Sequence, residues 1–271
     1  MVVMVSGASS TVERSPYIVR TSFTLGQSSS IVADWALKNG AKKIVTLVND
    51  WAPGLEAETT FKDVAVKGGA QVVESLRVPL ANPDFAPFLQ RARDLKPDTL
   101  FVLVPNHQAG PLVKQFLERG MDKSGIRLVA TGDLTPDDDL PNMTDTMLGL
   151  VTVHHYSANH DSALNKAYVD AFKHRYGSRP TFHSVAGYDA MHLIYEALKK
   201  TGGSTNGDVL MAAMKGMKWE SPRGPVSIDP ETRDIVQNEY IRKVQKLNGE
   251  MYNVEFATIE AVKDPLHSAK K

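Results

Sequence analysis

The sequence has no cysteine, no net charge and no long apolar run, and each absence excludes a class of protein. Without cysteine there is no disulfide, thiolate metal site, iron–sulfur cluster or cysteine nucleophile. The 31 Lys+Arg residues balance the 31 Asp+Glu residues. The chain therefore lacks the net positive charge with which a dedicated binder of nucleic acids or anionic membranes attracts its partner. No apolar run approaches the ~20 residues of a membrane span, and we expect no direct membrane insertion.

What is present is the composition of a soluble globular chain. Hydrophobic residues make up 42% and charged residues 23% of the 271 residues, which excludes wholesale disorder. This length suggests about two domains. The opening MVVMVSGASSTVERSPY has no basic segment before its short apolar stretch, unlike a secretion signal. We therefore expect either a protein that is not exported or a chain without its native beginning.

The first half alternates helical and strand-like segments. Helices are predicted over 27–39, 54–66, 85–95 and 109–119, and apolar strands over 42–50, 71–78, 99–104, 126–130 and 148–153. This rhythm is typical of an α/β fold with a doubly wound, mostly parallel sheet. Such sheets bind ligands at the carboxyl ends of their strands. The loops at those ends, 49–51, 105–107 and 131–133, are where we expect binding residues.

The second half is different in character. Helices are predicted over 162–176, 184–201 and 208–217, and strand fragments and turns over 221–234. Two alternating runs, 238–247 and 251–259, surround Asn248-Gly249, which is a strong hairpin signal. The last residues, 264–271, are expected to fray.

No catalytic or cofactor motif occurs in the chain. It contains no G-x-S-x-G, no G-x-G-x-x-G and no P-loop, so we expect no enzymatic activity and no cofactor. His154-His155, with His160, fits no metal-ligand spacing, and we interpret these residues as exposed loop imidazoles rather than a metal site. Trp51 follows a strand, where an aromatic side chain is either a stacking platform or a packing residue.

Several segments together resemble the type I periplasmic solute-binding proteins of branched-chain amino-acid (Leu/Ile/Val-binding) ABC transporters. They are MVSGASS followed by PYIVRTS, NDWAPGLEAETTFK, FHSVAGYDAMHLIYEALKKTGG and GMKWESPRGPVSIDPETRDIVQNEYIRKV. Their order and spacing cover essentially the whole chain. The resemblance implies a periplasmic protein with two α/β lobes that closes over a small solute, which membrane permease subunits then receive.

The resemblance also implies how the lobes are divided. Lobe one would comprise 1–22 and 154–230, and lobe two 23–153 and 231–271, with the ligand cleft at the hinge. Family members begin with further strand–helix units of lobe one, so this sequence opens inside that lobe. We therefore expect lobe one to be incomplete and helices 162–201 to expose apolar surface, which favours self-association.

Carried over from the family, one set of ligand contacts falls on the start of the chain and on the first strand-end loop. The segment Ala8, Ser9 and Ser10 would hold a ligand carboxylate through main-chain N–H groups and a hydroxyl. Trp51 stands where the family has an aromatic residue, usually Tyr, and would cover the apolar part of the ligand.

A second set falls on later loops. The acidic residue that takes the ammonium group in amino-acid binders aligns with Gly132, with Asp133 beside it. A second aromatic residue that the family has in its ligand cleft aligns near Asn106, so in this chain that contact with the ligand would be a different one. His183 and Tyr188 would reach the cleft from lobe one.

The leading hypothesis is an importer component for a small carboxylate-bearing solute. Branched-chain or other apolar amino acids come first, and aromatic or aliphatic carboxylic acids come close behind, because Trp51 and the displaced acidic residue favour such acids. The alternative is a ligand-sensing regulator of the same fold that signals to a partner protein. An α/β enzyme has no motif to support it.

Overall fold

A nine-stranded mixed sheet organises the chain. The computed structural model describes residues 1–268. Its strands follow the order β4-β3-β5-β6-β7-β10-β9-β8, and β11 pairs with residues 237–247 of β10, off this path. The strands are β3 (Lys43–Asn49), β4 (Gln71–Val78), β5 (Thr99–Leu103), β6 (Arg127–Thr131), β7 (Val151–His154), β8 (Lys218–Ser221), β9 (Gly224–Ile228), β10 (Ile235–Leu247) and β11 (Glu250–Val262). Strands β3 to β7 are mutually parallel, as predicted.

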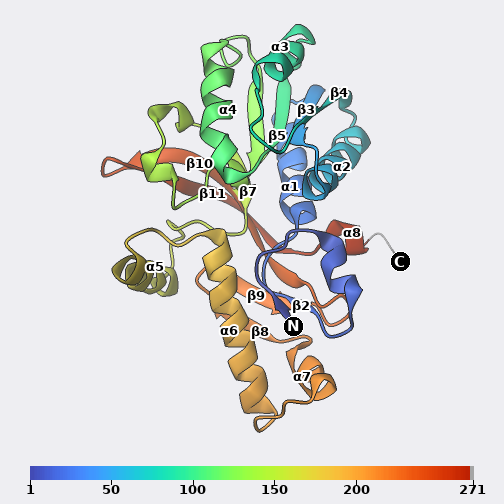
Figure 1. Ribbon diagram of the computed structural model, residues 1–271, viewed down its shortest axis with the longest axis vertical. Coiled ribbons are helices and arrows are strands. Elements are labelled where there is room, and N and C mark those ends of the chain that lie inside the picture. Colours follow the sequence, from blue (N-terminus) through green and yellow to red (C-terminus); the bar gives the residue numbers. More distant parts are fainter. Residues whose placement is uncertain (269–271) are drawn as a thin grey trace.

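Four helices cover the two faces of this parallel half (Figure 1). They are α1 (Leu25–Lys38), α2 (Ala52–Lys67), α3 (Ala86–Asp94) and α4 (Asn106–Glu118). Successive side chains of a strand point to opposite faces. In β5, Leu100 and Val102 accordingly pack with α3 and α4, whereas Phe101 and Leu103 pack with α1 and α2. The continuous apolar run of the sequence is explained by burial on both faces.

The second half adds α5 (Ala163–Tyr176), α6 (Phe182–Lys200) and α7 (Gly207–Met214), which lie in the lower part of Figure 1 with β8 and β9. A small separate sheet pairs β1 (Val2–Val3) with β2 (Val19–Arg20). The outward face of α6 leaves Tyr188, Met191 and Tyr195 exposed. Exposed apolar surface on the 162–201 helices was expected from the sequence, and the self-association it favours stays a prediction.

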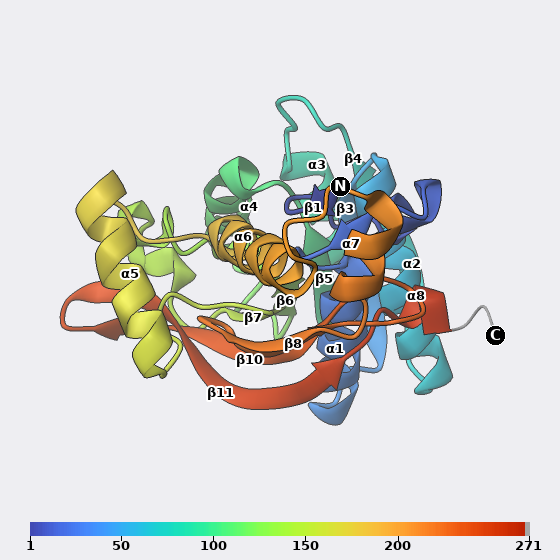
Figure 2. The same ribbon diagram turned by 90° about the horizontal axis from the view of Figure 1, so that it is seen from below.

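A long hairpin, β10–β11, connects the two halves of the fold (Figure 2). The start of β10 (235–237) pairs with β9, and its middle (240–243) pairs with β7. Asn248 and Gly249 form the turn with φ angles of 52° and 87°, the two positive values that a type I′ turn requires. The predicted hairpin is confirmed.

Two sequence interpretations are wrong. Residues 264–268 do not fray: α8 (Pro265–Ser268) forms there, and His267 bonds to Asp234; residues 269–271 lie outside the described part. His154 and His155 are fully buried, not exposed, because the loop after β7 turns inward against Phe23. Burial lowers the pKa of both imidazoles well below the ordinary value, so both are neutral.

The predicted helices and strands agree with the structure to within about three residues at most ends. A buried ion pair fixes α6 to the remainder of the chain: the Arg223 guanidinium lies 2.8 Å from Asp189 and donates to the carbonyl oxygens of Thr21 and Ser22. Among residues 1–268, no helix combines the length and apolar character needed to cross a membrane.

Candidate functional site

A cavity of about 480 Å³ opens at the carboxyl ends of β3, β5 and β6. This is the edge at which a doubly wound sheet binds its ligands. The volume lies within the range of about 300–1,000 Å³ typical of small-molecule sites. The lining residues come from the first eight residues, the start of α1, the strand-end loops and the start of α6. They are Val5, Ser6, Gly7, Ala8, Phe23, Leu25, Trp51, Pro53, Leu103, Val104, Pro105, Asn106, His107, Asp133 and His183.

Trp51 forms part of the wall and is 37% exposed. It is the residue before α2, in extended conformation, and its amide donates to the Asn49 carbonyl oxygen at 2.9 Å. A Cβ on Gly54 would lie 2.4 Å from that same oxygen and 3.0 Å from the Trp51 ring. Glycine at position 54 therefore permits the tight turn that presents the indole to the cavity.

Phe23 supplies a second aromatic surface. Its ring stacks on His155 at 5.1 Å and packs edge-on against Phe182 at 5.5 Å. The ring of His183, which also lines the cavity, lies 5.9 Å away. Because this cluster is held from several elements, the wall near Phe23 is rigid and largely apolar.

Asp133 and His183 bring polar groups to the apolar cavity. Thr131 donates from Oγ1 to Asp133 Oδ2 at 2.7 Å, and burial raises the pKa of the Asp133 carboxyl. Burial lowers the pKa of His183, while the Asp133 and Asp138 carboxylates oppose that effect. The Nδ1 atom of His183 is buried and has no hydrogen-bond partner among residues 1–268. The pair can therefore accept or donate hydrogen bonds to a bound molecule.

Two helices begin at the cavity. Trp51 precedes α2, and Asn106 and His107 open α4; all three residues line the cavity. Neither helix has a side-chain cap or an acidic residue in its first turn. The first N–H groups of a helix have no partner within that helix, and the macrodipole adds partial positive charge. Both ends suit a carboxylate.

The segment that contains Ala8 is held in place by the buried guanidinium of Arg20. Arg20 donates to the carbonyl oxygens of Ser6 and, at 2.6 Å, Ala8, and its Nε lies 2.7 Å from Asp234. The hydroxyl of Ser22 also donates to Ser6 at 2.9 Å. The guanidinium of Arg20 therefore fixes the segment with Ser6 and Ala8, which forms one edge of the cavity.

Five of the nine predicted site residues line this one cavity: Ala8, Trp51, Asn106, Asp133 and His183. Ser9 and Ser10 do not. The amide and hydroxyl of Ser9 donate to the Glu56 carboxylate at 3.0 and 2.9 Å, and Ser10 is exposed. The Ser9 donors that were predicted to bind a ligand carboxylate are therefore satisfied by Glu56 of α2.

Gly132 and Tyr188 also lie outside the lining. Gly132 is packed against buried side chains: a Cβ there would lie 2.3 Å from the Arg242 guanidinium and 2.4 Å from His154. Tyr188 faces Tyr168 of α5 instead, with the two ring centroids 5.4 Å apart. Its position follows from helix geometry, because five residues beyond His183 correspond to a rotation of about 140° around the helix axis.

Sequence reasoning missed most of the apolar lining. Phe23, Leu25, Pro53 and Leu103 carry no motif. His107 belongs to the loop 105–107 in which binding residues were expected, and Leu103 is the last residue of β5, just before that loop. Phe23 had no such signal, because its place depends on the packing of distant histidines.

The comparisons with known proteins agree with this architecture. Residues 1–249 match the family described as "Periplasmic binding protein". The Leu/Ile/Val-binding protein homolog 6 of Brucella abortus (strain 2308) is 44% identical over 272 residues, covering 98% of this chain and 69% of the relative.

Two solved structures are also similar. An ABC-transporter solute-binding protein of Rhodopseudomonas palustris BisB5, in complex with 3,4-dihydroxybenzoic acid, is 62% identical with a TM-score of 0.93, covering 98% of this chain and 73% of that one. An ABC-transporter solute-binding protein of Rhodopseudomonas palustris HaA2, in complex with p-hydroxybenzoic acid, is 42% identical with a TM-score of 0.95. The match covers 100% of this chain and 74% of that one. With a family match over most of its length and a fold shared with these transport proteins, the chain belongs to the periplasmic binding protein family.

Proposed function

We propose that the protein is the extracytoplasmic solute-binding component of an ABC importer and that its solute is a small aromatic carboxylate with a ring hydroxyl group. The observation that carries this proposal is one cavity that combines an aromatic wall, the partly buried side chains of Asp133 and His183, and two helix N-termini without a side-chain cap. The solute is bound and released without chemical conversion.

The carboxylate is recognised by the starts of α2 and α4. Both helices begin beside lining residues without a side-chain cap, and no acidic side chain of their first turns competes for a bound anion. In α2 Pro53 has no N–H, and in α4 the Gln108 N–H donates to the Pro105 carbonyl oxygen, so the other first-turn N–H groups are the proposed donors. Fixed backbone dipoles suit an anion because they need no reorganisation when it binds. This role replaces the one predicted for Ser9, whose donors bind Glu56.

The ring lies against Trp51 and Phe23, and its hydroxyl bonds to the Asp133–His183 pair. A phenol hydroxyl donates one proton, and either the Asp133 carboxylate or the His183 Nδ1 atom can accept it. Hydrogen bonds to a charged acceptor contribute about 1.5–3 kcal/mol, so the pair discriminates between hydroxylated and plain rings. The ligands named for the two Rhodopseudomonas proteins have this chemistry.

An apolar α-amino acid is the second candidate, favoured by the name of the Brucella relative. Its ammonium group would pair with Asp133, and its side chain would contact Trp51. A ligand-sensing regulator of the same fold remains the functional alternative, since it would use the same cavity.

We further propose that closure brings together lobe one, 1–22 and 154–230, and lobe two, 23–153 and 231–271. The cavity lining supports this division, since Ala8 and His183 come from the first part and Trp51 and Asp133 from the second. The implied partners are membrane permease subunits, and the implied compartment is the periplasm.

Isothermal titration calorimetry with 4-hydroxybenzoate, 3,4-dihydroxybenzoate, benzoate, leucine and valine tests the proposal. We expect the hydroxylated aromatic acids to bind most tightly and the amino acids not to bind. Binding of leucine or valine alone would establish the second candidate. Absence of heat with every ligand, together with no shift in melting temperature, would refute a carboxylate-binding role.

Two variants locate the contacts. Trp51→Ala should weaken all aromatic ligands about tenfold through the lost ring contact. Asp133→Asn should weaken the hydroxylated acids about tenfold while leaving benzoate unchanged. Tyr195→Ala, which removes an exposed aromatic ring on α6, is the matched control and should leave every affinity unchanged. Equal losses for benzoate and 4-hydroxybenzoate in Asp133→Asn would contradict the assigned role of Asp133.

A further inference from the structure

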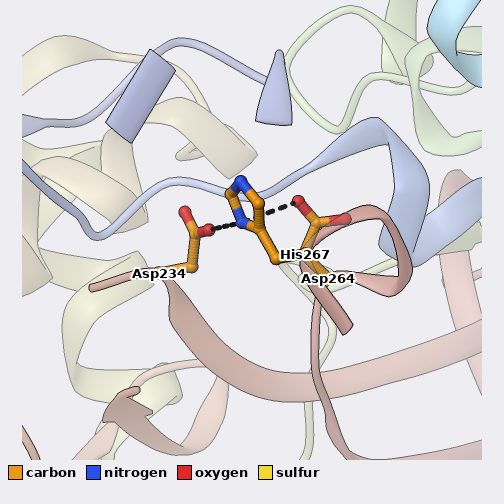
Figure 3. A group of neighbouring side chains, drawn as sticks. All are labelled: Asp234, Asp264 and His267. Carbon is orange, nitrogen blue, oxygen red and sulfur yellow. Dashed lines mark hydrogen bonds and ion pairs between the residues drawn. The ribbon is translucent and has the colours of Figure 1, made fainter. Parts of the chain in front are cut away.

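Three side chains that can bind a metal ion, Asp234, Asp264 and His267, lie next to one another (Figure 3), and none of them lines the ligand cavity. Asp234 immediately precedes β10, while Asp264 and His267 follow β11 and lie beside and within α8. We propose that Asp234, Asp264 and His267 form a binding site for a divalent transition-metal ion, with zinc or manganese as the best match.

The donor atoms converge. His267 Nδ1 is 2.5 Å from Asp234 Oδ2 and 3.5 Å from Asp264 Oδ2, and the three atoms all lie within 4.8 Å of one another. Metal–ligand bonds of about 2.1 Å place neighbouring ligand atoms about 3–3.5 Å apart. Small side-chain rotations therefore suffice to bring all three onto one ion. One imidazole and two carboxylates form a nitrogen–oxygen donor set that suits zinc and manganese.

A further residue supports the imidazole from behind. The second ring nitrogen of His267, Nε2, lies 3.1 Å from Glu13 Oε1, and Glu13 belongs to the 3₁₀ helix Ser9–Arg14. A metal-binding histidine commonly donates its other N–H to a carboxylate, which fixes the tautomer that leaves the first nitrogen free for the ion. Glu13 occupies this position for an ion bound at Nδ1.

The site is rich in carboxylates. Three of them, of Glu13, Asp234 and Asp264, surround His267, and Asp234 also pairs with the Arg20 guanidinium at 2.7 Å. Carboxylate oxygens together with an imidazole nitrogen are ligands that zinc and manganese accept.

Space for water ligands is present at the same place. A cavity of about 120 Å³ is lined by the three donors together with Asp229, Glu231, Thr232, Ile235, Val236 and Lys263. A water molecule occupies about 30 Å³ in the liquid, so two or three waters can complete the coordination of an ion held by three protein ligands.

The site is connected to the ligand cavity through one side chain. Arg20 binds Asp234 through Nε and binds the carbonyl oxygens of Ser6 and Ala8, which line that cavity, through its other nitrogens. An ion that fixes Asp234 therefore also fixes Arg20 and the segment beyond it. The proposed role is to hold the two chain segments together and stabilise one edge of the cavity.

Zinc and manganese titrations of the full chain, stripped of metal with a chelator and kept free of organic ligand, test the proposal. We expect saturable binding of one ion per chain and a higher melting temperature with metal. Asp264→Asn and His267→Gln should abolish both effects. Glu13→Gln, which changes only the carboxylate behind the imidazole, should weaken binding about 10–100-fold.

His174→Gln is the matched control, since His174 is exposed on α5, and it should bind the ion like the wild type. Absence of saturable binding, or unchanged stoichiometry and affinity in Asp264→Asn, would overturn the proposal and leave the cluster as a hydrogen-bonded clamp. Circular dichroism of each variant checks folding, and Asp264→Asn serves if His267→Gln does not fold. No aromatic solute is present, so the result is independent of the proposed function.

Discussion

The side chain of Glu239 predicts an unusual dependence of stability on pH. It lies on β10, is completely buried, and its Oε2 accepts a hydrogen bond from the Ser28 hydroxyl of α1 at 2.9 Å. Burial raises its pKa to about 8, against an ordinary value of 4.5, although the Arg223 and Arg242 guanidinium groups act in the opposite direction. The folded protein therefore keeps a proton that the unfolded chain has lost.

The sign and size follow from linkage. Below pH 4.5 both states are protonated and the raised pKa contributes its full stability. Between pH 4.5 and 8 only the folded state holds the proton, so the stability falls by about 1.4 kcal/mol per pH unit. The loss is about 3 kcal/mol at pH 7 and about 5 kcal/mol at pH 9. Glu239→Gln, with a neutral side chain of the same shape, should be free of this loss.

Urea denaturation of the wild type and of Glu239→Gln at half-unit steps from pH 5 to 9 measures the effect. The variant should gain stability relative to the wild type as the pH rises, with the gain levelling off above pH 8. Glu260→Gln, at an exposed position on β11, should run parallel to the wild type. Parallel curves for Glu239→Gln would refute the claim that a buried, protonated carboxyl is present.

Three further substitutions test the packing by urea denaturation. Gly132→Ala should cost about 1–3 kcal/mol, since the new methyl group meets the buried Arg242 guanidinium at 2.3 Å. Gly110→Ala in α4, where nothing lies within 4 Å, should instead stabilise by about 0.5–1 kcal/mol, and destabilisation there would contradict the packing. Asp189→Asn should cost about 3–5 kcal/mol, because Arg223 would keep its charge without its carboxylate; a loss below 1 kcal/mol would show that water reaches the pair.

The sheet was predictable because its determinants are local. The span 71–78 was predicted to the residue, and the Asn248-Gly249 turn has the positive φ angles that its dipeptide favours. The strand-end loops brought Trp51, Asn106 and Asp133 into one cavity, since parallel strands end at the same edge of the sheet.

The features that the sequence did not predict, namely the contacts of Ser9 and His267 and the burial of His155, share a different cause. The environment of Ser9 is set by Glu56, 47 residues away, and that of His267 by Glu13, 254 residues away. Such contacts carry no signal in a single sequence, because they depend on how complete elements are packed. Burial of His155 likewise follows from the arrival of Phe23 over the loop.

The continuity of β10 has a mechanical consequence. The strand passes without a break from its pairing with β9 to its pairing with β7, and the register with β11 shifts between Gln237 and Glu239 and again between Ile241 and Arg242. Any movement of the two halves relative to each other would therefore have to twist the β10–β11 hairpin. A bulge concentrates twist where it occurs. In the proposed closure of the two lobes, the resistance of this hairpin to twisting would contribute to how fast the closed state reopens.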